Sequence, residues 1–112
     1  MPNNTRRAYL QHKETARTVV QERLDYWNKF YNFSYRRVAI RRQHARWGSC
    51  SKKKNLNFNY RIIFLPHELK DYIIVHELCH LQELHHGKAF WNLVAKTIPD
   101  YQARRRTLQR TT

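Results

Sequence analysis

Two histidines and a glutamate in the run His76-Glu77-Leu78-Cys79-His80 have the types and the spacing that metal-assisted hydrolysis needs. Residues four apart on an α-helix are displaced by about 40° around the axis and by about 6 Å along it, so His76 and His80 point the same way and could chelate one metal ion. Glu77 is not needed as a ligand, and as a general base it could take a proton from metal-activated water. The pattern therefore predicts a zinc site that carries out hydrolysis.

Such a pattern also arises by chance on helices whose histidines bind nothing. The preceding residues Tyr72-Ile73-Ile74-Val75 are apolar, so this helix is expected to cross the core, where His and Glu without partners would be costly. A buried metal would explain them. Further on, Gly87 allows the chain to turn back, and either His85 or His86 could complete a three-histidine site that leaves a fourth position for water.

The elements that must position these residues follow from the periodicity of the apolar side chains. Pro66 is well placed to open the helix that carries the motif, and Gly87 to end a helix. We expect a helix over about 5–30, a strand through Val38 and Ile40, a hairpin over about 46–60, the motif helix over about 67–84, a helix to Ile98 and a short basic helix over about 100–108. This order predicts an α+β fold with a long N-terminal helix, a small antiparallel sheet and C-terminal helices, in a single domain over residues 1–112.

Composition limits the remaining possibilities. The chain has 22 Lys and Arg against eight Asp and Glu, a formal net charge of +14, which favours polyanions without choosing a reaction. Its apolar runs are far shorter than the roughly 20 residues of a membrane-spanning helix. No apolar stretch follows the basic N-terminus, so we expect a cytoplasmic protein that contacts no membrane. Cys50 and Cys79 are expected to be free thiols.

Four ordered blocks, which together cover about half of the chain, resemble the YgjP-like metallopeptidases, relatives of the SprT-type zincins. The blocks are Arg46-Trp47-Gly48-Ser49-Cys50, Leu56-Asn57-Phe58-Asn59, the motif helix from Asp71 to Leu81, and His86-Gly87-Lys88-Ala89-Phe90-Trp91. The resemblance implies a zincin-like fold in a minimal core version, with His76, His80 and His86 as zinc ligands and Glu77 as the catalytic base. The family's Asn-His-Ser reads His85-His86-Gly87 here, so His85 stays an alternative third ligand.

Other residues have more than one interpretation. The run from Trp47 to Cys50 could line a substrate cleft, but a tight structural turn with Trp47 in the core is the favoured interpretation. Four residues are conceivable donors to the oxyanion that forms during hydrolysis, and the sequence does not choose among them. They are Arg46, Tyr60, Arg61 and Tyr72.

Three hypotheses for function remain in view. The first is a zinc-dependent metallopeptidase of the HExxH type that acts on peptide or protein substrates and associates with nucleic acid. The second is a basic module that binds DNA or RNA around a structural zinc, and the third is a zinc hydrolase of a non-peptide anionic substrate. Three histidines beside a glutamate favour an open, catalytic site over a closed, structural one. The sequence gives no oligomeric state.

Overall fold

The computed structural model describes residues 4–111 of the chain. Its elements in chain order are α1 (Arg6–Tyr31), β1 (Arg37–Arg41), β2 (Gly48–Cys50), β3 (Asn55–Asn59), the short 3₁₀ helix η1 (Tyr60–Phe64), α2 (His67–His80), α3 (Lys88–Thr97) and α4 (Tyr101–Thr111). The α+β class predicted from the sequence is confirmed. α2 ends at His80 rather than near Leu84, and Gly87 is the N-cap of α3 rather than the residue that stops α2.

The sheet is mixed, whereas the sequence predicted an antiparallel one. The expected hairpin is present, because β2 pairs antiparallel with β3. β3 also pairs with β1, in parallel, so it occupies the centre of the order β1-β3-β2. Leu56 and Phe58 of β3 are fully buried, whereas β1 begins and ends with exposed arginines. The most buried strand therefore takes the position that has neighbours on both sides.

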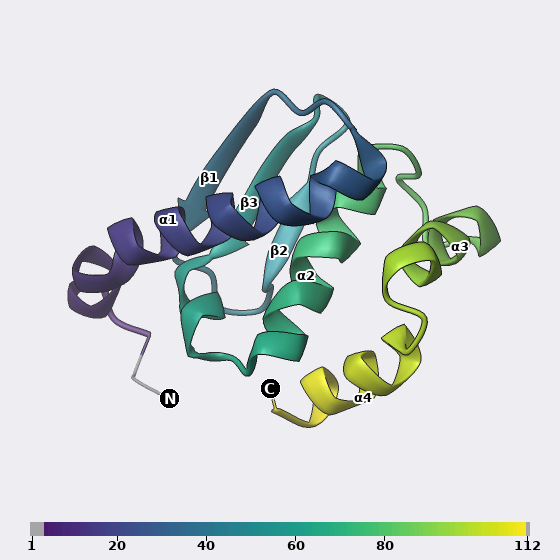
Figure 1. Cartoon of the computed structure of the whole chain (residues 1–112). Helices are drawn as coiled ribbons and strands as arrows, with labels where there is room; N and C mark the ends of the chain where they lie inside the picture. Colours follow the sequence, from purple (N-terminus) through teal and green to yellow (C-terminus); the bar gives the residue numbers. More distant parts are fainter. Residues whose placement is uncertain (1–3, 112) are drawn as a thin grey trace.

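The motif helix α2 lies at the centre of the molecule, between the sheet and the α3–α4 pair (Figure 1). Ten of its fourteen residues are buried, which explains why its apolar residues follow no single stripe. One side of α2, including Ile74 and Leu78, joins the core formed with α1 and the sheet. Val75 and Cys79 on another side pack against Phe90 and Val94 of α3. The helix that carries the motif is thereby fixed from both sides.

The long helix α1 lies across the sheet and α2 (Figure 1). It starts at the N-cap Thr5, whose side chain accepts a hydrogen bond from the backbone of Ala8, and it buries Val20 and Leu24. Arg23 of α1 also donates two hydrogen bonds, of 2.8 and 2.9 Å, to the carboxylate of Asp71 in α2. Apolar burial and this ion pair together hold α2 in place. Among residues 4–111, no helix is both long enough and apolar enough to cross a membrane.

Candidate metal centre

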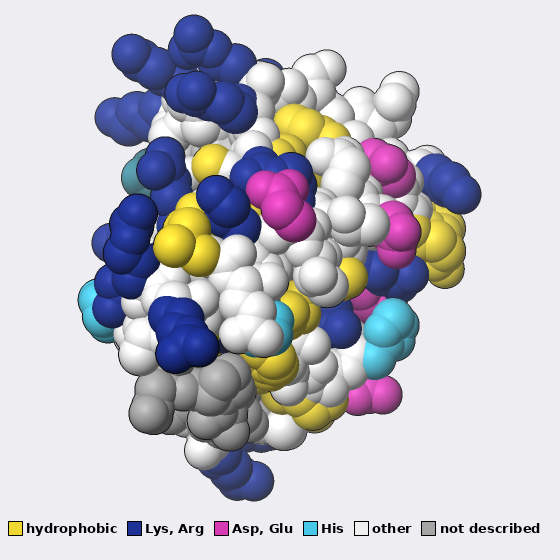
Figure 2. Space-filling model, turned by 90° about the vertical axis from the view of Figure 1, so that its left-hand side faces the viewer, with side chains coloured by type: hydrophobic (Ala, Val, Ile, Leu, Met, Phe, Trp, Pro, Cys, Tyr) yellow, Lys and Arg dark blue, Asp and Glu magenta, His cyan; other side chains and the backbone are white. Residues whose placement is uncertain are grey.

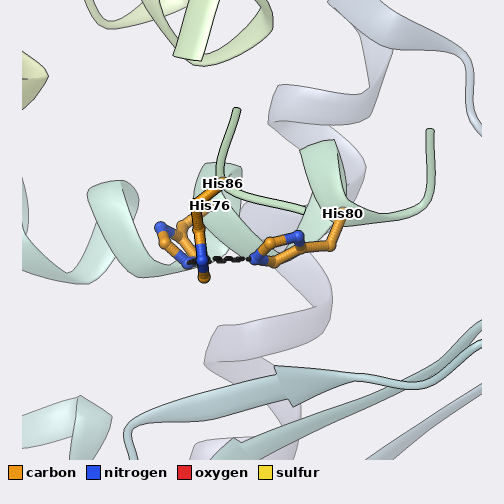
Figure 3. A group of neighbouring side chains, drawn as sticks. All are labelled: His76, His80 and His86. Atoms are coloured by element: carbon orange, nitrogen blue, oxygen red, sulfur yellow. Dashed lines mark hydrogen bonds between the residues drawn. The ribbon is translucent and has the colours of Figure 1, made fainter. Parts of the chain in front are cut away.

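His76, His80 and His86 come together at the C-terminal end of α2. One face of the helix carries His76 and His80, and the irregular segment after the helix brings His86 beside them (Figure 3). Their Nε2 atoms lie 3.2, 2.9 and 3.1 Å from one another. Three nitrogen ligands of a tetrahedral zinc ion lie about 3.3–3.4 Å apart, since each zinc–nitrogen bond is about 2.0–2.1 Å. The spacing and the donor type fit a transition-metal ion.

The rings of the cluster are oriented by hydrogen bonds at their outer nitrogens. Nδ1 of His80 lies 3.0 Å from the carbonyl oxygen of Glu83. A carbonyl only accepts, so this Nδ1 carries the hydrogen and the Nε2 lone pair is left for a metal. Nδ1 of His76 lies 3.4 Å from the hydroxyl of Tyr72, which can either donate or accept, so this contact orients the ring without placing its hydrogen. These contacts at Nδ1 orient two of the three imidazoles so that their Nε2 atoms face Nε2 of His86.

Aromatic packing from α3 supports the same rings. The ring of His80 stacks on Phe90 with centroids 4.3 Å apart, and the ring of His86 stacks on Trp91 at 5.9 Å. Burial lowers the pKa of His76 to about 3, with further contributions from His80 and His86, and burial also lowers the pKa of His80. Both imidazoles are therefore neutral at physiological pH, the form in which histidine binds metals.

Glu77 points from α2 toward strand β2. Its side chain is buried, with 6% of the residue exposed, and burial raises its pKa to about 8, while the positive charge of Arg46 acts in the opposite direction. Gly48 of β2 makes this approach possible. A Cβ atom on Gly48 would lie 3.1 Å from Cγ and 3.2 Å from Oε2 of Glu77. The carboxylate therefore occupies space that any other residue at position 48 would contest.

A cleft opens beside His76 and Glu77, between β2 and α4. Its β2 side includes Arg46, Gly48, Ser49 and Cys50, and its α4 side includes Arg105. The favoured prediction of a structural turn over residues 47–50 is therefore wrong. The segment from Gly48 is a strand, and it lines the cleft because its pairing with β3 directs it along α2. Trp47 lies partly buried against the core.

Comparison with known proteins identifies the family. The model of the YgjP-like metallopeptidase domain matches residues 2–111. The chain belongs to the YgjP-like metallopeptidases. No curated protein matches this YgjP-like chain.

Solved structures show the same fold. The metallopeptidase zymogen abylysin from Pyrococcus abyssi superposes with a TM-score of 0.74 at 22% identity, covering 82% of this chain and 93% of its own. The metallopeptidase zymogen jannalysin from Methanocaldococcus jannaschii superposes with a TM-score of 0.58 at 24% identity, covering 87% of this chain and 97% of its own. These likenesses concern the fold, which is that of zincin-like metallopeptidases, as expected from the sequence.

Membership of the YgjP-like metallopeptidases implies a metal ion, and the convergent imidazole nitrogens are suitable donors for one. Among residues 4–111, this is the only cluster of three or more potential metal ligands, and His85 lies outside it. Of the four conceivable oxyanion donors, Arg46 and Tyr72 line the cleft. Tyr60 instead donates to Asn4, and Arg61 to the backbone of Gln43.

Two residues at the cleft of this YgjP-like chain were not found from the sequence. Arg105 and Trp91 line a hollow together with His76 and His86. Arg105 stands in the run Arg104-Arg105-Arg106, where nothing in the sequence distinguishes it from its neighbours. Trp91 belongs to a block of the family resemblance, but its type alone indicates only packing. The expected free thiols are present, with Cys79 buried and Cys50 partly exposed.

Proposed function

We propose that this chain is a zinc-dependent peptidase in which His76, His80 and His86 hold the metal and Glu77 is the general base. The observation that supports this proposal most strongly is the convergence of three Nε2 atoms within 2.9–3.2 Å, in a cleft that also contains the Glu77 carboxylate. One domain over residues 1–112 contains every residue that the proposal uses. The cytoplasmic location expected from the N-terminus stays a prediction.

Zinc suits this donor set, since three imidazoles leave a fourth position open, and such an ion acts as a Lewis acid that polarises a carbonyl and acidifies water. Hydrogen bonds to Glu83 and Tyr72 keep the rings of His80 and His76 in the orientation that ligation requires. The ring of His80 stacks on Phe90, and only 7% of this histidine is exposed to solvent. These contacts orient the two helix-borne ligands.

Glu77 would move the protons of the reaction. Burial raises the pKa of its carboxyl group to about 8, so its carboxylate is a stronger base than that of an exposed glutamate. It can accept a proton from water at Oε2 and return it to the amine that leaves. Because Gly48 has no Cβ, it leaves room for this carboxylate at the cleft.

Strand β2 provides a place for an extended peptide. It is an edge strand, since β3 separates it from β1. Its residues Gly48, Ser49 and Cys50 line the cleft that contains His76 and Glu77. An extended substrate that paired with this edge would pass its backbone in front of both side chains. This geometry favours a peptide over the alternative small anionic substrate.

A weaker association with nucleic acid is a second part of the proposal. Lys and Arg side chains gather along one margin of the face in Figure 2, with few acidic ones among them. At one end of the sheet, the backbone amide of Arg36 donates to the carbonyl of Lys54, which brings the exposed Arg36 and Arg37 next to the exposed turn Lys52-Lys53-Lys54. These cations at one sheet end suit the phosphates of DNA or RNA, with a strong dependence on salt.

Peptidase activity is tested with zinc-loaded protein and an unfolded protein substrate such as reduced casein. We expect peptide products by mass spectrometry, their loss in a chelator, and their return when zinc is added back. Glu77→Gln should retain the metal and lose at least 100-fold in kcat, as loss of a general base typically costs about 10²–10⁴-fold. Full activity in Glu77→Gln would contradict the proposed role of this residue.

A further inference from the structure

We propose that the cleft selects peptides with a carboxylate next to the bond that is cleaved, and that Arg46 and Arg105 bind this carboxylate from opposite walls. The inference rests on the proposed peptidase function, for which it names a class of substrate. Both arginines line the cleft that contains His76 and Glu77. Arg46 precedes strand β2, and Arg105 belongs to α4, so a peptide between these elements would pass between the two cations.

Arg105 is held in place by an aromatic stack. Its guanidinium carbon lies 5.4 Å from the ring centroid of Trp91. Trp91 also stacks on Tyr101, with centroids 4.9 Å apart and an angle of 13° between the rings. The same Trp91 lies 5.9 Å from the rings of both His76 and His86. A guanidinium group seated on this stack is positioned close to the three histidines and keeps its donors for a ligand.

Arg46 is anchored through its backbone. Its carbonyl oxygen accepts a hydrogen bond of 2.9 Å from the side chain of Asn59, which is fully buried. The backbone amide of Asn59 donates to the carbonyl of Trp47 at 2.8 Å, so the segment is tied at two successive residues. The side chain of Arg46 stays exposed and faces both hollows beside Glu77.

The two arginines have charge to offer a ligand. Among residues 4–111, no ion pair involves Arg46 or Arg105. Glu77 is the only acidic residue among the residues that line the cleft. The net charge of +14 would also attract acidic substrates from a distance. Planar guanidinium groups match a carboxylate by two parallel hydrogen bonds, which favours Asp or Glu over neutral side chains.

The test uses acetylated, amidated octapeptides of Ala and Leu that differ only in a central pair, which is Glu-Glu, Gln-Gln or Lys-Lys. Binding of fluorescein-labelled versions to zinc-loaded Glu77→Gln is measured by anisotropy at 150 mM salt, and cleavage by the wild type is followed by mass spectrometry. The labelled Glu-Glu peptide should bind at least tenfold more tightly than the Gln-Gln peptide. Arg46→Gln or Arg105→Gln should each reduce this preference about fivefold to tenfold. This loss lies between the contribution of an exposed ion pair and that of an enclosed hydrogen bond to a charged group.

Arg106→Gln is the matched control, because it removes the same charge from the exposed neighbour of Arg105. Arg106 is absent from the lining of the cleft. It should leave the preference within about twofold. Arg105→Lys keeps the charge but loses the planar fork, so it should retain only part of the preference. Equal losses in Arg105→Gln and Arg106→Gln would show that the net charge selects the peptide, and would overturn the inference.

Failure of the inference and failure of the peptidase proposal give different results. Cleavage of all three peptides with equal binding would overturn the acidic preference and leave the peptidase intact. A preference that depends on Arg46 and Arg105, without cleavage by the wild type, would support the inference and contradict the peptidase. If a Gln-Gln peptide with a free C-terminus bound as tightly as the Glu-Glu peptide, this would support recognition of a carboxylate and identify the chain end as its source. A thymidine oligonucleotide is tested in the same way. If both arginine variants lost more affinity for it than for the Glu-Glu peptide, phosphate would be the ligand and the inference would be overturned.

Discussion

Replacing Gly48 by alanine would place a methyl group between strand β2 and the carboxylate of Glu77. The new Cβ would lie 3.1 Å from Cγ of Glu77 and 3.0 Å from the carbonyl oxygen of Asn57. Carbon atoms in contact prefer about 3.5–4.0 Å, so the Glu77 side chain or the strand must move by about 0.4–0.9 Å. Asn57 belongs to the central strand β3, which is paired on both sides and therefore resists the movement.

The two consequences of this substitution differ in size. Crowding of a packed interior by one methyl group typically costs about 1–3 kcal/mol of stability. A displacement of about 1 Å at a catalytic group can cost about 100-fold in rate. We therefore expect Gly48→Ala to unfold at a lower urea concentration, to lose about tenfold to 100-fold in kcat, and to keep its zinc, because the three histidines are untouched.

Three measurements on the same preparation test this expectation: urea unfolding, the zinc content and kcat with a peptide substrate. Gly87→Ala is the matched control, since it changes the other glycine of the chain, where an added Cβ meets nothing within 4 Å. It should lose no more than about 1 kcal/mol, as expected of a changed N-cap, and keep its activity. Wild-type kcat in Gly48→Ala would refute the view that the glycine positions Glu77.

Two further predictions concern the stability of the metal-free protein. Asp71→Asn should lower the free energy of unfolding by about 1–3 kcal/mol in urea titrations, because it breaks the paired hydrogen bonds from Arg23, which is itself 23% exposed; an unchanged midpoint would contradict the role of this ion pair. Glu77→Gln should gain stability over the wild type as pH rises from about 5 to 8. In the folded wild type, burial raises the pKa of Glu77 to about 8, whereas in the unfolded chain this carboxyl ionises near its ordinary pKa. Between these two pKa values a rising pH therefore favours the unfolded wild type, and Glu77→Gln avoids this loss. Melting temperatures in a chelator at pH 5 and pH 8 test this, and a constant difference between the two proteins would contradict it.

The spacing of the motif was sufficient to predict that His76 and His80 share one face of a buried helix. This prediction depends on local geometry alone, since four residues make little more than one turn. The position of His86 depends on the path of residues 81–87, which form no regular element. Periodicity carries no information there, so the residues alone left His85 and His86 open, and only the family resemblance favoured His86.

The parts of the fold that depend on distant segments were predicted less well. The parallel pairing of β1 with β3 results from β3 taking the centre of the sheet, which alternation within a single strand does not reveal. The segment after Trp47 resembles a turn in composition. Only its pairing with β3, and the lack of space for a Cβ beside Glu77, show why position 48 is a glycine. Arg105 lines the cleft from α4, whose Tyr101 stacks on Trp91 of α3, and this tertiary contact has no sequence signal.

We propose that His76, His80 and His86 together hold one zinc ion. The most direct test is elemental analysis of purified wild type, His86→Ala and His85→Ala after exposure to zinc and removal of the excess. His85 is the adjacent control, exposed and outside the cluster. We predict about one zinc per chain in the wild type and in His85→Ala, and a loss in His86→Ala. Zinc retained in folded His86→Ala, or absent from folded wild type, would contradict this three-histidine zinc site.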